Sequence, residues 1–168
     1  MNIKNLKKEI IIELLKENKI KVKDFIDSKV CPTCFDRENN NLIYGKKDDL
    51  MLYKDDDIEC FLITNPRSPG HTVISSMRHY KDMLEIPDDL CIKVFLMAKK
   101  MMNIIKDVYS CESVYLCTMC DGPINHFHVQ LIPRYSYEER GSKNFVKERK
   151  KYQEDRKKID KIRKNLEK

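Results

Sequence analysis

Short apolar runs and one long periodic segment divide the middle of the chain. The runs are bounded by turn formers, as at 55–57, where three aspartates stand together, and at 65–70, where two prolines and Gly70 gather. A helical period begins at Pro87, where a proline and two acids suit a helix N-terminus, and continues to about Val108. Five short strands with one long helix before the last pair predict an α+β fold with a mostly antiparallel sheet. The predicted strands cover 50–53, 58–64, 72–76, 113–119 and 126–132.

Both ends of the chain carry helical patterns outside this central region. Apolar residues recur at helical spacing within 3–17, and the charged tail is predicted to be helical from about Phe145. The methionine-rich stripe of the long central helix is predicted to be core or subunit interface. Together these patterns predict an N-terminal helical extension over 1–24, a central domain over 25–137 and a basic helical tail over 138–168.

Composition changes this picture in one respect, the placement of charge. Charged residues make up 36% of the chain, above the roughly 25% of an average domain. Residues 134–168 hold 14 Lys/Arg against 7 Asp/Glu, a net of +7, whereas residues 1–133 hold the remaining 19 against 20, a net of −1. The basic character therefore belongs to the tail, and its interspersed acids argue against nucleic acid as a partner.

No apolar run approaches the roughly 18 residues that a membrane span needs, and no secretory leader is visible. A cytoplasmic location is expected. The seven cysteines are accordingly interpreted as free thiols and candidate metal ligands, not as a disulfide framework.

One predicted strand, 126–132, carries a polar face of chemical interest. Because side chains alternate along a strand, His126, His128 and Gln130 share one face, and an apolar face lies opposite. Two imidazoles and an amide held at fixed spacing on a rigid element suit preorganised catalysis. The alternative is a solvated strand face that happens to hold two of the four histidines of the chain.

A Cys-x-x-Cys pair offers a metal clip near the start of the central domain. Cys31 and Cys34 supply two thiolates, and His79 and His126 are the plausible remaining ligands of a zinc site that ties distant segments together. A redox role, or no role, is the alternative for a lone pair of this kind. The second pair, Cys117 and Cys120, has poor chelating geometry on a strand and is interpreted as ordinary thiols.

With these residues in place, the stretch from about Cys31 to Tyr135 resembles the histidine-triad (HIT) superfamily of nucleotide hydrolases and transferases. Four motifs carry the resemblance: Phe61-Leu62-Ile63-Thr64-Asn65-Pro66, Pro69-Gly70-His71-Thr72-Val73-Ile74, Arg78-His79-Tyr80, and His126-Phe127-His128-Val129-Gln130-Leu131-Ile132-Pro133-Arg134. The third triad position is glutamine, which resembles the branch of galactose-1-phosphate uridylyltransferase and the diadenosine tetraphosphate phosphorylases.

The resemblance implies a role for each candidate residue. It implies structural zinc on Cys31, Cys34, His79 and His126, the same set that ligand chemistry selects. It also implies His128 as the nucleophile, Gln130 as a contact to phosphate oxygens and Asn65 as a ribose contact. Pro123 stands where the hydrolase branch usually carries a serine that helps to protonate the leaving group, so Asn125 is the candidate hydrogen-bond donor there.

The sequence thus predicts a nucleotidyltransferase or nucleotide hydrolase that acts at the α-phosphate of a dinucleoside polyphosphate or nucleotide sugar. The reaction would pass through a nucleotidyl-His128 intermediate, and transfer is favoured over phosphoramidase chemistry. A homodimer is expected. The alternative is a non-catalytic, zinc-stabilised module that binds nucleotides or nucleic acid.

Overall fold

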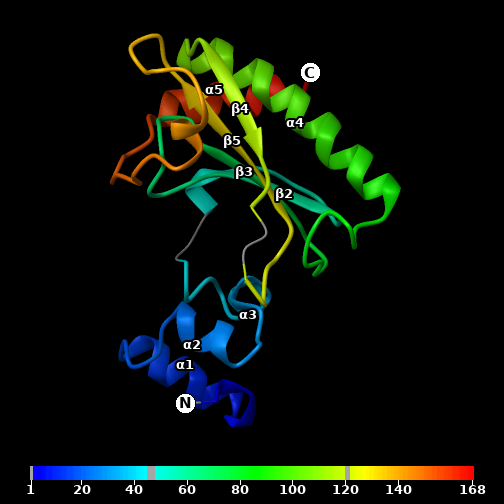
Figure 1. Cartoon of the computed structure of the whole chain (residues 1–168), viewed down its shortest axis with the longest axis vertical. Helices are drawn as coiled ribbons and strands as arrows, with labels where there is room; N and C mark the ends of the chain where they lie inside the picture. The colour runs from blue at the N-terminus through cyan, green and yellow to red at the C-terminus, as the bar shows by residue number, and fades with distance from the viewer. Residues whose placement is uncertain (1, 45–47, 120–121) are drawn as a thin grey trace.

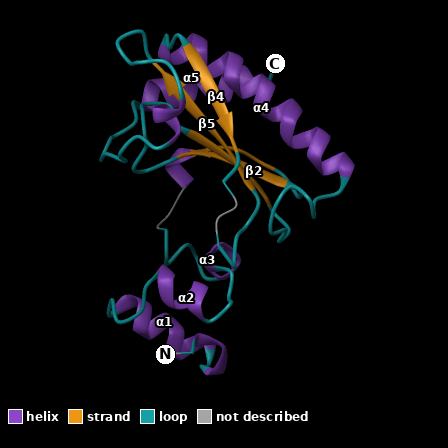
Figure 2. Cartoon of the chain, in the orientation of Figure 1, coloured by secondary structure: helices purple, strands orange, loops and turns teal. Residues whose placement is uncertain are grey.

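The computed structural model describes residues 2–44, 48–119 and 122–168. Figure 1 shows two parts, a sheet backed by helices and a small helical lobe formed by the N-terminal residues. Figure 2 shows that the lobe contains helices and loops only, whereas the strands lie together in the larger part. The α+β class and the antiparallel sheet with its long helix are therefore confirmed.

The sheet has five antiparallel strands in the order β1-β2-β3-β5-β4. The last strand begins at His128, two residues later than predicted, because His126 and Phe127 belong to the segment that approaches it. Strand β2 ends at Leu62, before the turn-forming residues that follow. The strands are β1 (Met51–Lys54), β2 (Ile58–Leu62), β3 (Thr72–Ser76), β4 (Ser113–Cys117) and β5 (His128–Arg134).

Two helices cover one face of the sheet, α4 (Asp88–Tyr109) and α5 (Arg156–Leu166). The core between them takes alternate residues from each strand and the inward stripe of α4, which fits the helical period that the sequence shows. In this core Val94, Met101 and Ile105 of α4 are buried, as are Val129 and Leu131 of β5.

The residues between these core positions face the other side of the sheet. Cross-strand partners share a face, and the register pairs Phe61 with Val73, Val73 with Gln130, and Ser75 with His128. The polar residues of β5 and the middles of β2 and β3 thus form one continuous surface. That surface is the floor of the candidate functional site.

The N-terminal lobe has its own small core of Ile3, Ile11, Ile20 and Phe25. The helix predicted over 3–17 is divided into a 3-10 turn and a separate α-helix, because the chain turns at Leu6. The rings of Phe25 and Phe35 pack with centroids 5.0 Å apart. Its elements are η1 (Ile3–Asn5), α1 (Lys8–Lys16), α2 (Val22–Asp27) and α3 (Pro32–Glu38), with η2 (Asp48–Leu50) leading into the sheet.

The prediction of a continuous helix from about Phe145 was wrong. After η3 (Ser142–Phe145) the chain runs without regular structure over 146–155 and turns helical only at Arg156. Contacts to the body hold this segment. Glu154 accepts hydrogen bonds from the Gly70 N–H (3.0 Å) and from the Tyr109 hydroxyl (2.5 Å). Gly70 has φ +81°, and a Cβ there would lie 2.9 Å from the Tyr109 ring, so the position requires glycine.

None of the described helices combines the length and apolar character that a membrane crossing requires.

Candidate functional site

A cluster of two thiols and two imidazoles lies where the N-terminal lobe meets the sheet. Cys31 precedes α3 and Cys34 lies in its first turn, whereas His79 follows β3 and His126 precedes β5. Their ligand atoms all lie within 4.8 Å of one another. The structure therefore brings together the four residues that the sequence selects as metal ligands.

The distances within this cluster fit tetrahedral zinc. Bonds of about 2.3 Å to sulfur and about 2.05 Å to nitrogen would separate sulfur and nitrogen ligand atoms by about 3.6 Å. His126 Nδ1 lies 3.6 Å from Cys31 Sγ and 3.4 Å from Cys34 Sγ, and His79 Nδ1 lies 3.4 Å from Cys34 Sγ. The pKa of the Cys31 thiol is lowered, chiefly by a hydrogen bond with Cys34 and with further help from His126, which favours the thiolate that binds metal.

The second ring nitrogen of His126 fixes which nitrogen is available to the cluster. His126 Nε2 lies 2.8 Å from the backbone carbonyl of Ser76, which only accepts, and 3.1 Å from Arg37 Nη1, which only donates. We assign the Nε2 proton to the shorter contact, the one to the carbonyl. Nδ1 is then left with its lone pair directed at the thiols. A metal ligand held through its other nitrogen in this way keeps a fixed ring orientation.

Arg37 of α3 reinforces the same junction, and no motif in the sequence points to this residue. Its guanidinium donates to the Ser76 carbonyl at 2.7 Å and to the Met77 carbonyl at 2.9 Å. It also forms a largely buried ion pair with Glu59 of β2, with Nη2 and Oε1 2.7 Å apart. Lobe and sheet are thus joined by an arginine as well as by the cluster.

His128 stands two residues from the cluster, at the start of β5, and its ring is held differently. His128 Nδ1 lies 2.8 Å from the carbonyl of His126, so Nδ1 carries the proton and Nε2 carries the lone pair. The pKa of His128 is lowered from its ordinary value, first by burial. The imidazole is therefore neutral near pH 7, the form that acts as a nucleophile.

Gln130 lies beside His128 and is oriented by His71, a residue to which the sequence assigns no role. His71 is fully buried, and its Nδ1 accepts from the Arg67 N–H at 3.1 Å, so its Nε2 carries the proton. That Nε2 lies 3.1 Å from Gln130 Oε1. The amide oxygen thus faces His71, and the amide nitrogen faces His128 Nε2 at 3.4 Å. Burial, the largest cause, lowers the pKa of His71 to about 3, which keeps this arrangement neutral.

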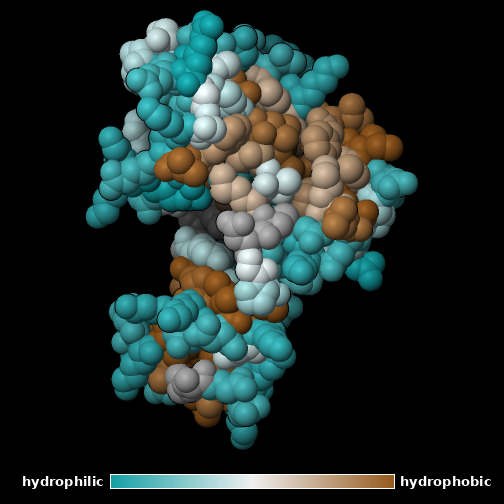
Figure 3. Space-filling view, in the orientation of Figure 1, coloured by the Kyte–Doolittle hydropathy of each residue, from teal (hydrophilic) through white to brown (hydrophobic). Residues whose placement is uncertain are grey.

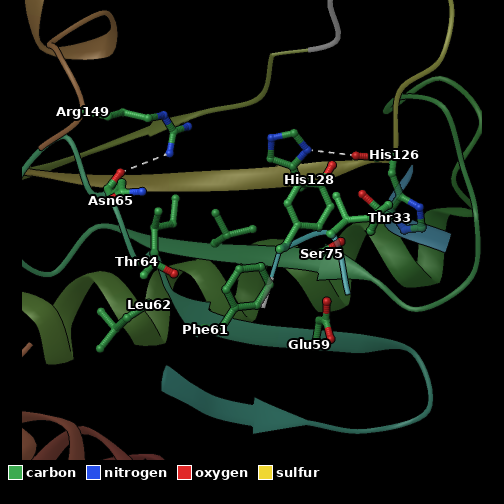
Figure 4. A pocket seen from close by; sticks show the side chains of 14 residues that line it. Thr33, Glu59, Phe61, Leu62, Thr64, Asn65, Ser75, His126, His128 and Arg149 are labelled. Atoms are coloured by element: carbon green, nitrogen blue, oxygen red, sulfur yellow. Dashed lines mark hydrogen bonds between the residues drawn. The ribbon is translucent and has the colours of Figure 1, made fainter. Parts of the chain in front are cut away.

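A cavity of about 510 Å³ opens over this polar face (Figure 4). Drug-sized ligands occupy cavities of roughly 300–1,000 Å³. The lining is apolar at Phe61, Leu62 and Val73, and polar at Asn65 and His128. Figure 4 places Arg149, from the tail segment 146–155, on the same side of β5 as His128. From the sequence, the tail is predicted only to carry positive charge, and no residue of it is singled out for the site.

Gln130 is buried next to His128 and is not among the residues that line the cavity. The remaining candidates lie farther from the cavity. Asn125 donates from Nδ2 to the Lys81 carbonyl at 2.6 Å, and it does not contribute to the described lining. Pro123 is exposed in the segment before His126. Cys117 is a half-buried thiol at the end of β4, and its pKa is raised by burial. Its predicted companion, Cys120, lies outside the described residues.

Comparisons with known proteins bear on this architecture. A family model of the HIT domain matches residues 45–137. An uncharacterized HIT-like protein of Methanocaldococcus jannaschii is 31% identical over 98 residues, which cover 56% of this chain and 75% of the relative. An adenylylsulfatase of Arabidopsis thaliana is 34% identical over 101 residues, which cover 55% of this chain and 49% of that protein.

The fold also has relatives among solved structures. The crystal structure of a zinc-bound histidine triad family protein from Mycobacterium smegmatis superposes with a TM-score of 0.61 at 15% identity, over 82% of this chain and 93% of that one. This likeness extends to the fold alone. The match to the HIT domain family, however, covers more than half of the chain, including the strand that carries His128 and Gln130. The protein is therefore a member of the HIT family.

Proposed function

We propose that this protein binds a nucleotide in the cavity above β5 and transfers its nucleotidyl group through His128. One observation carries the proposal. The Nδ1 of His128 is committed to the His126 carbonyl, so the Nε2 lone pair lies at the cavity wall, where the Gln130 amide nitrogen is its partner at 3.4 Å. A neutral nucleophile next to a hydrogen-bond donor is the pairing that attack on a phosphate ester needs.

The cavity offers different surroundings for the parts of a nucleotide. Apolar side chains from β2 and β3 suit the faces of a base, and they include Phe61, Leu62 and Val73. Asn65 also lines the cavity, and its side-chain amide can hydrogen-bond to ribose hydroxyls. With base and ribose so placed, the α-phosphate would come to lie against His128 and Gln130. The site therefore supports recognition of a mononucleotidyl group.

The proposed chemical step is a double displacement at the α-phosphorus. The Nε2 lone pair of His128 forms an N–P bond while the bond from phosphorus to the leaving oxygen breaks, and the leaving group takes that electron pair. Water, phosphate or a sugar phosphate then attacks the same phosphorus and releases any proton on the attacking oxygen to solvent. The N–P bond breaks, and neutral His128 is restored.

Gln130 would stabilise the negative charge that develops on the phosphate oxygens. Because His71 holds the amide oxygen, the amide nitrogen is directed at His128 Nε2, the atom that would bond to phosphorus. One preorganised donor of this kind typically contributes about 2.7–4 kcal/mol to transition-state stabilisation. His71 is thus a positioning residue in the proposed mechanism.

The cluster of Cys31, Cys34, His79 and His126 would hold a structural zinc ion. The sulfur-to-nitrogen distances support this, as does zinc in the Mycobacterium smegmatis structure. With four protein ligands, zinc would supply structural cross-linking of lobe and sheet and no open position for water. His126 would thereby be fixed, and with it the carbonyl that orients His128.

The substrate class follows from the family and from the triad. Compounds with a nucleotidyl group on an anionic leaving group fit best, namely dinucleoside polyphosphates, nucleotide sugars and adenylyl sulfate. The Arabidopsis thaliana relative is named for action on the last of these. The glutamine in the third triad position favours transfer to phosphate or to a sugar phosphate over transfer to water.

The outer surface of α4 supports a homodimer. Ile92, Phe95 and Leu96 expose 61%, 38% and 62% of their surface at helical spacing, and Figure 3 shows a hydrophobic region over this side of the molecule. Light scattering should report twice the chain mass for the wild type and a single chain for Leu96→Arg. A single-chain mass for the wild type would contradict the proposal.

A substrate panel tests the proposed activity. Zinc-loaded protein is incubated with diadenosine polyphosphates, UDP-sugars, adenosine 5′-phosphosulfate and adenosine 5′-phosphoramidate, with and without inorganic phosphate. We expect release of a nucleoside monophosphate, or of a diphosphate when phosphate is the acceptor, and no release by His128→Ala. Nucleotide binding without turnover of any of these compounds would favour a non-catalytic nucleotide-binding module.

A further inference from the structure

The tail segment 146–155, here called the strap, contributes Arg149 to the cavity lining and is fixed to the body along its length. The Lys147 carbonyl accepts a hydrogen bond from the Arg67 guanidinium. The Lys150 N–H donates to the Pro66 carbonyl at 3.1 Å. Further along, Glu154 holds the Gly70 N–H at 3.0 Å. Arg149 lies between Lys147 and Lys150, so the hydrogen bonds of these neighbours hold the strap backbone that places Arg149 at the cavity.

Arg149 and Arg67 bring two positive charges close to each other. Neither forms an ion pair within residues 2–44, 48–119 and 122–168. The Arg67 Nε is buried and has no hydrogen-bond partner in that part of the chain. The pKa of Arg149 is lowered by burial first and then by the charge of Arg67. Two guanidinium groups whose positive charges repel each other would both be stabilised by an anion bound between them.

The position of Arg149 relative to His128 indicates which anion it would meet. Figure 4 shows the Arg149 guanidinium and the His128 imidazole on the same side of β5, and both residues line the cavity. Arg149 also contacts the Asn65 carbonyl at 3.4 Å, at the end of the cavity assigned to ribose. An in-line attack expels the leaving group on the side of phosphorus opposite to His128. That side faces the strap.

We propose that Arg149 binds the negative charge of the leaving group and selects substrates whose α-phosphate carries a second phosphate or a sulfate. The inference rests on the nucleotidyl-transfer function proposed above. Arginine presents planar donors that match phosphate and sulfate oxygens. A leaving group that departs as a neutral amine would gain nothing from this contact. The strap would thus give the site a preference for anionic leaving groups.

Calorimetry with two nucleotides tests the assignment. AMP carries only the α-phosphate, and the non-hydrolysable α,β-methylene analogue of ADP adds the second phosphate. Both are titrated into the full-length wild type, Arg149→Gln and Lys150→Gln. The last is a matched control, because it removes one positive charge from the neighbouring strap residue, whose backbone makes the contact to Pro66 and whose side chain does not line the cavity.

Arg149→Gln should lower the affinity for the ADP analogue by about 10-fold or more and the affinity for AMP by less than about 3-fold. Lys150→Gln should change neither beyond about 3-fold. An equal loss for both nucleotides, or no loss for either, would overturn the role of Arg149 while leaving the proposed function in place. No binding of either nucleotide to the wild type would overturn the proposed function itself.

Kinetics supply a second readout. For Arg149→Gln we expect kcat/KM to fall at least about 10-fold with adenosine 5′-phosphosulfate and to stay within about 3-fold with adenosine 5′-phosphoramidate. A parallel fall for both compounds would contradict selection of the leaving group.

Discussion

His126 and His128 stand two residues apart, and the structure holds them in opposite ways. His126 gives its Nε2 proton to the Ser76 carbonyl and turns Nδ1 toward two thiols. His128 gives its Nδ1 proton to the His126 carbonyl and turns Nε2 toward the cavity. In each ring, one nitrogen is hydrogen-bonded to a backbone carbonyl, and the other faces the thiols or the cavity.

The difference between them lies in the acceptor that each ring can reach. His126 lies before β5 and beside the end of β3, so a carbonyl of the neighbouring strand is within reach of Nε2. His128 lies in β5 itself and reaches back along its own chain. The choice of tautomer follows from this, and it is the basis for the proposal that one ring binds metal and the other attacks phosphorus.

The largest expected effect comes from replacing each of the two histidines and measuring both kcat and zinc content. His128→Ala should lower kcat by at least about 10⁴-fold, because the attacking nitrogen is gone, while the protein keeps one zinc ion per chain. His126→Ala should lose bound zinc and the stability that comes with it. Steady-state kinetics and elemental analysis on both variants check this. Full zinc content in His126→Ala would remove that residue from the metal site.

A second pair of variants separates the effect of the Gln130 amide from that of His71, the residue that orients it. Gln130→Ala should lower kcat by about 10²–10³-fold, because it removes the amide that stabilises the transition state. His71→Asn should lower kcat by less, since the amide is still present but has lost the partner that orients it. KM should change little in either variant. If His71→Asn alters only thermal stability and leaves kcat unchanged, the orienting role is wrong.

The smallest expected effect is a displaced pH profile. Only neutral His128 can attack phosphorus, so protonation abolishes activity as pH falls. Burial lowers the pKa of His128 below its ordinary 6.5, so kcat/KM should stay level through pH 6.5 and decline only below it. Zinc content measured at each pH controls for acid release of the metal. A decline that begins above pH 6.5 would contradict a neutral, buried nucleophile.

Much of the site could be predicted because it depends on short spacings. Alternation along one strand is enough to place His128 and Gln130 on one face. Ligand chemistry, together with the small number of histidines, is enough to select His79 and His126 for Cys31 and Cys34. These inferences need no knowledge of how separate elements pack.

The contacts that were missed all depend on register or packing between distant segments. The bond from His71 to Gln130 needs the pairing of β3 with β5, and the bond from Arg37 to Glu59 needs the lobe docked on the sheet. The strap is charged on nearly every face, so it has no periodicity to distinguish helix from extended chain. Its path is set instead by bonds such as that from Gly70 to Glu154.

The central claim is that His128 Nε2 becomes covalently bonded to phosphorus, and trapping the intermediate tests it most directly. Wild-type protein at steady state with its best substrate is quenched in alkali, which preserves an N–P bond, and the digested peptides are weighed by mass spectrometry. The account predicts one nucleotidyl group on the peptide that contains His128, lost on mild acid treatment and absent from His128→Ala. Turnover with no adduct, or with the group on another residue, would contradict it.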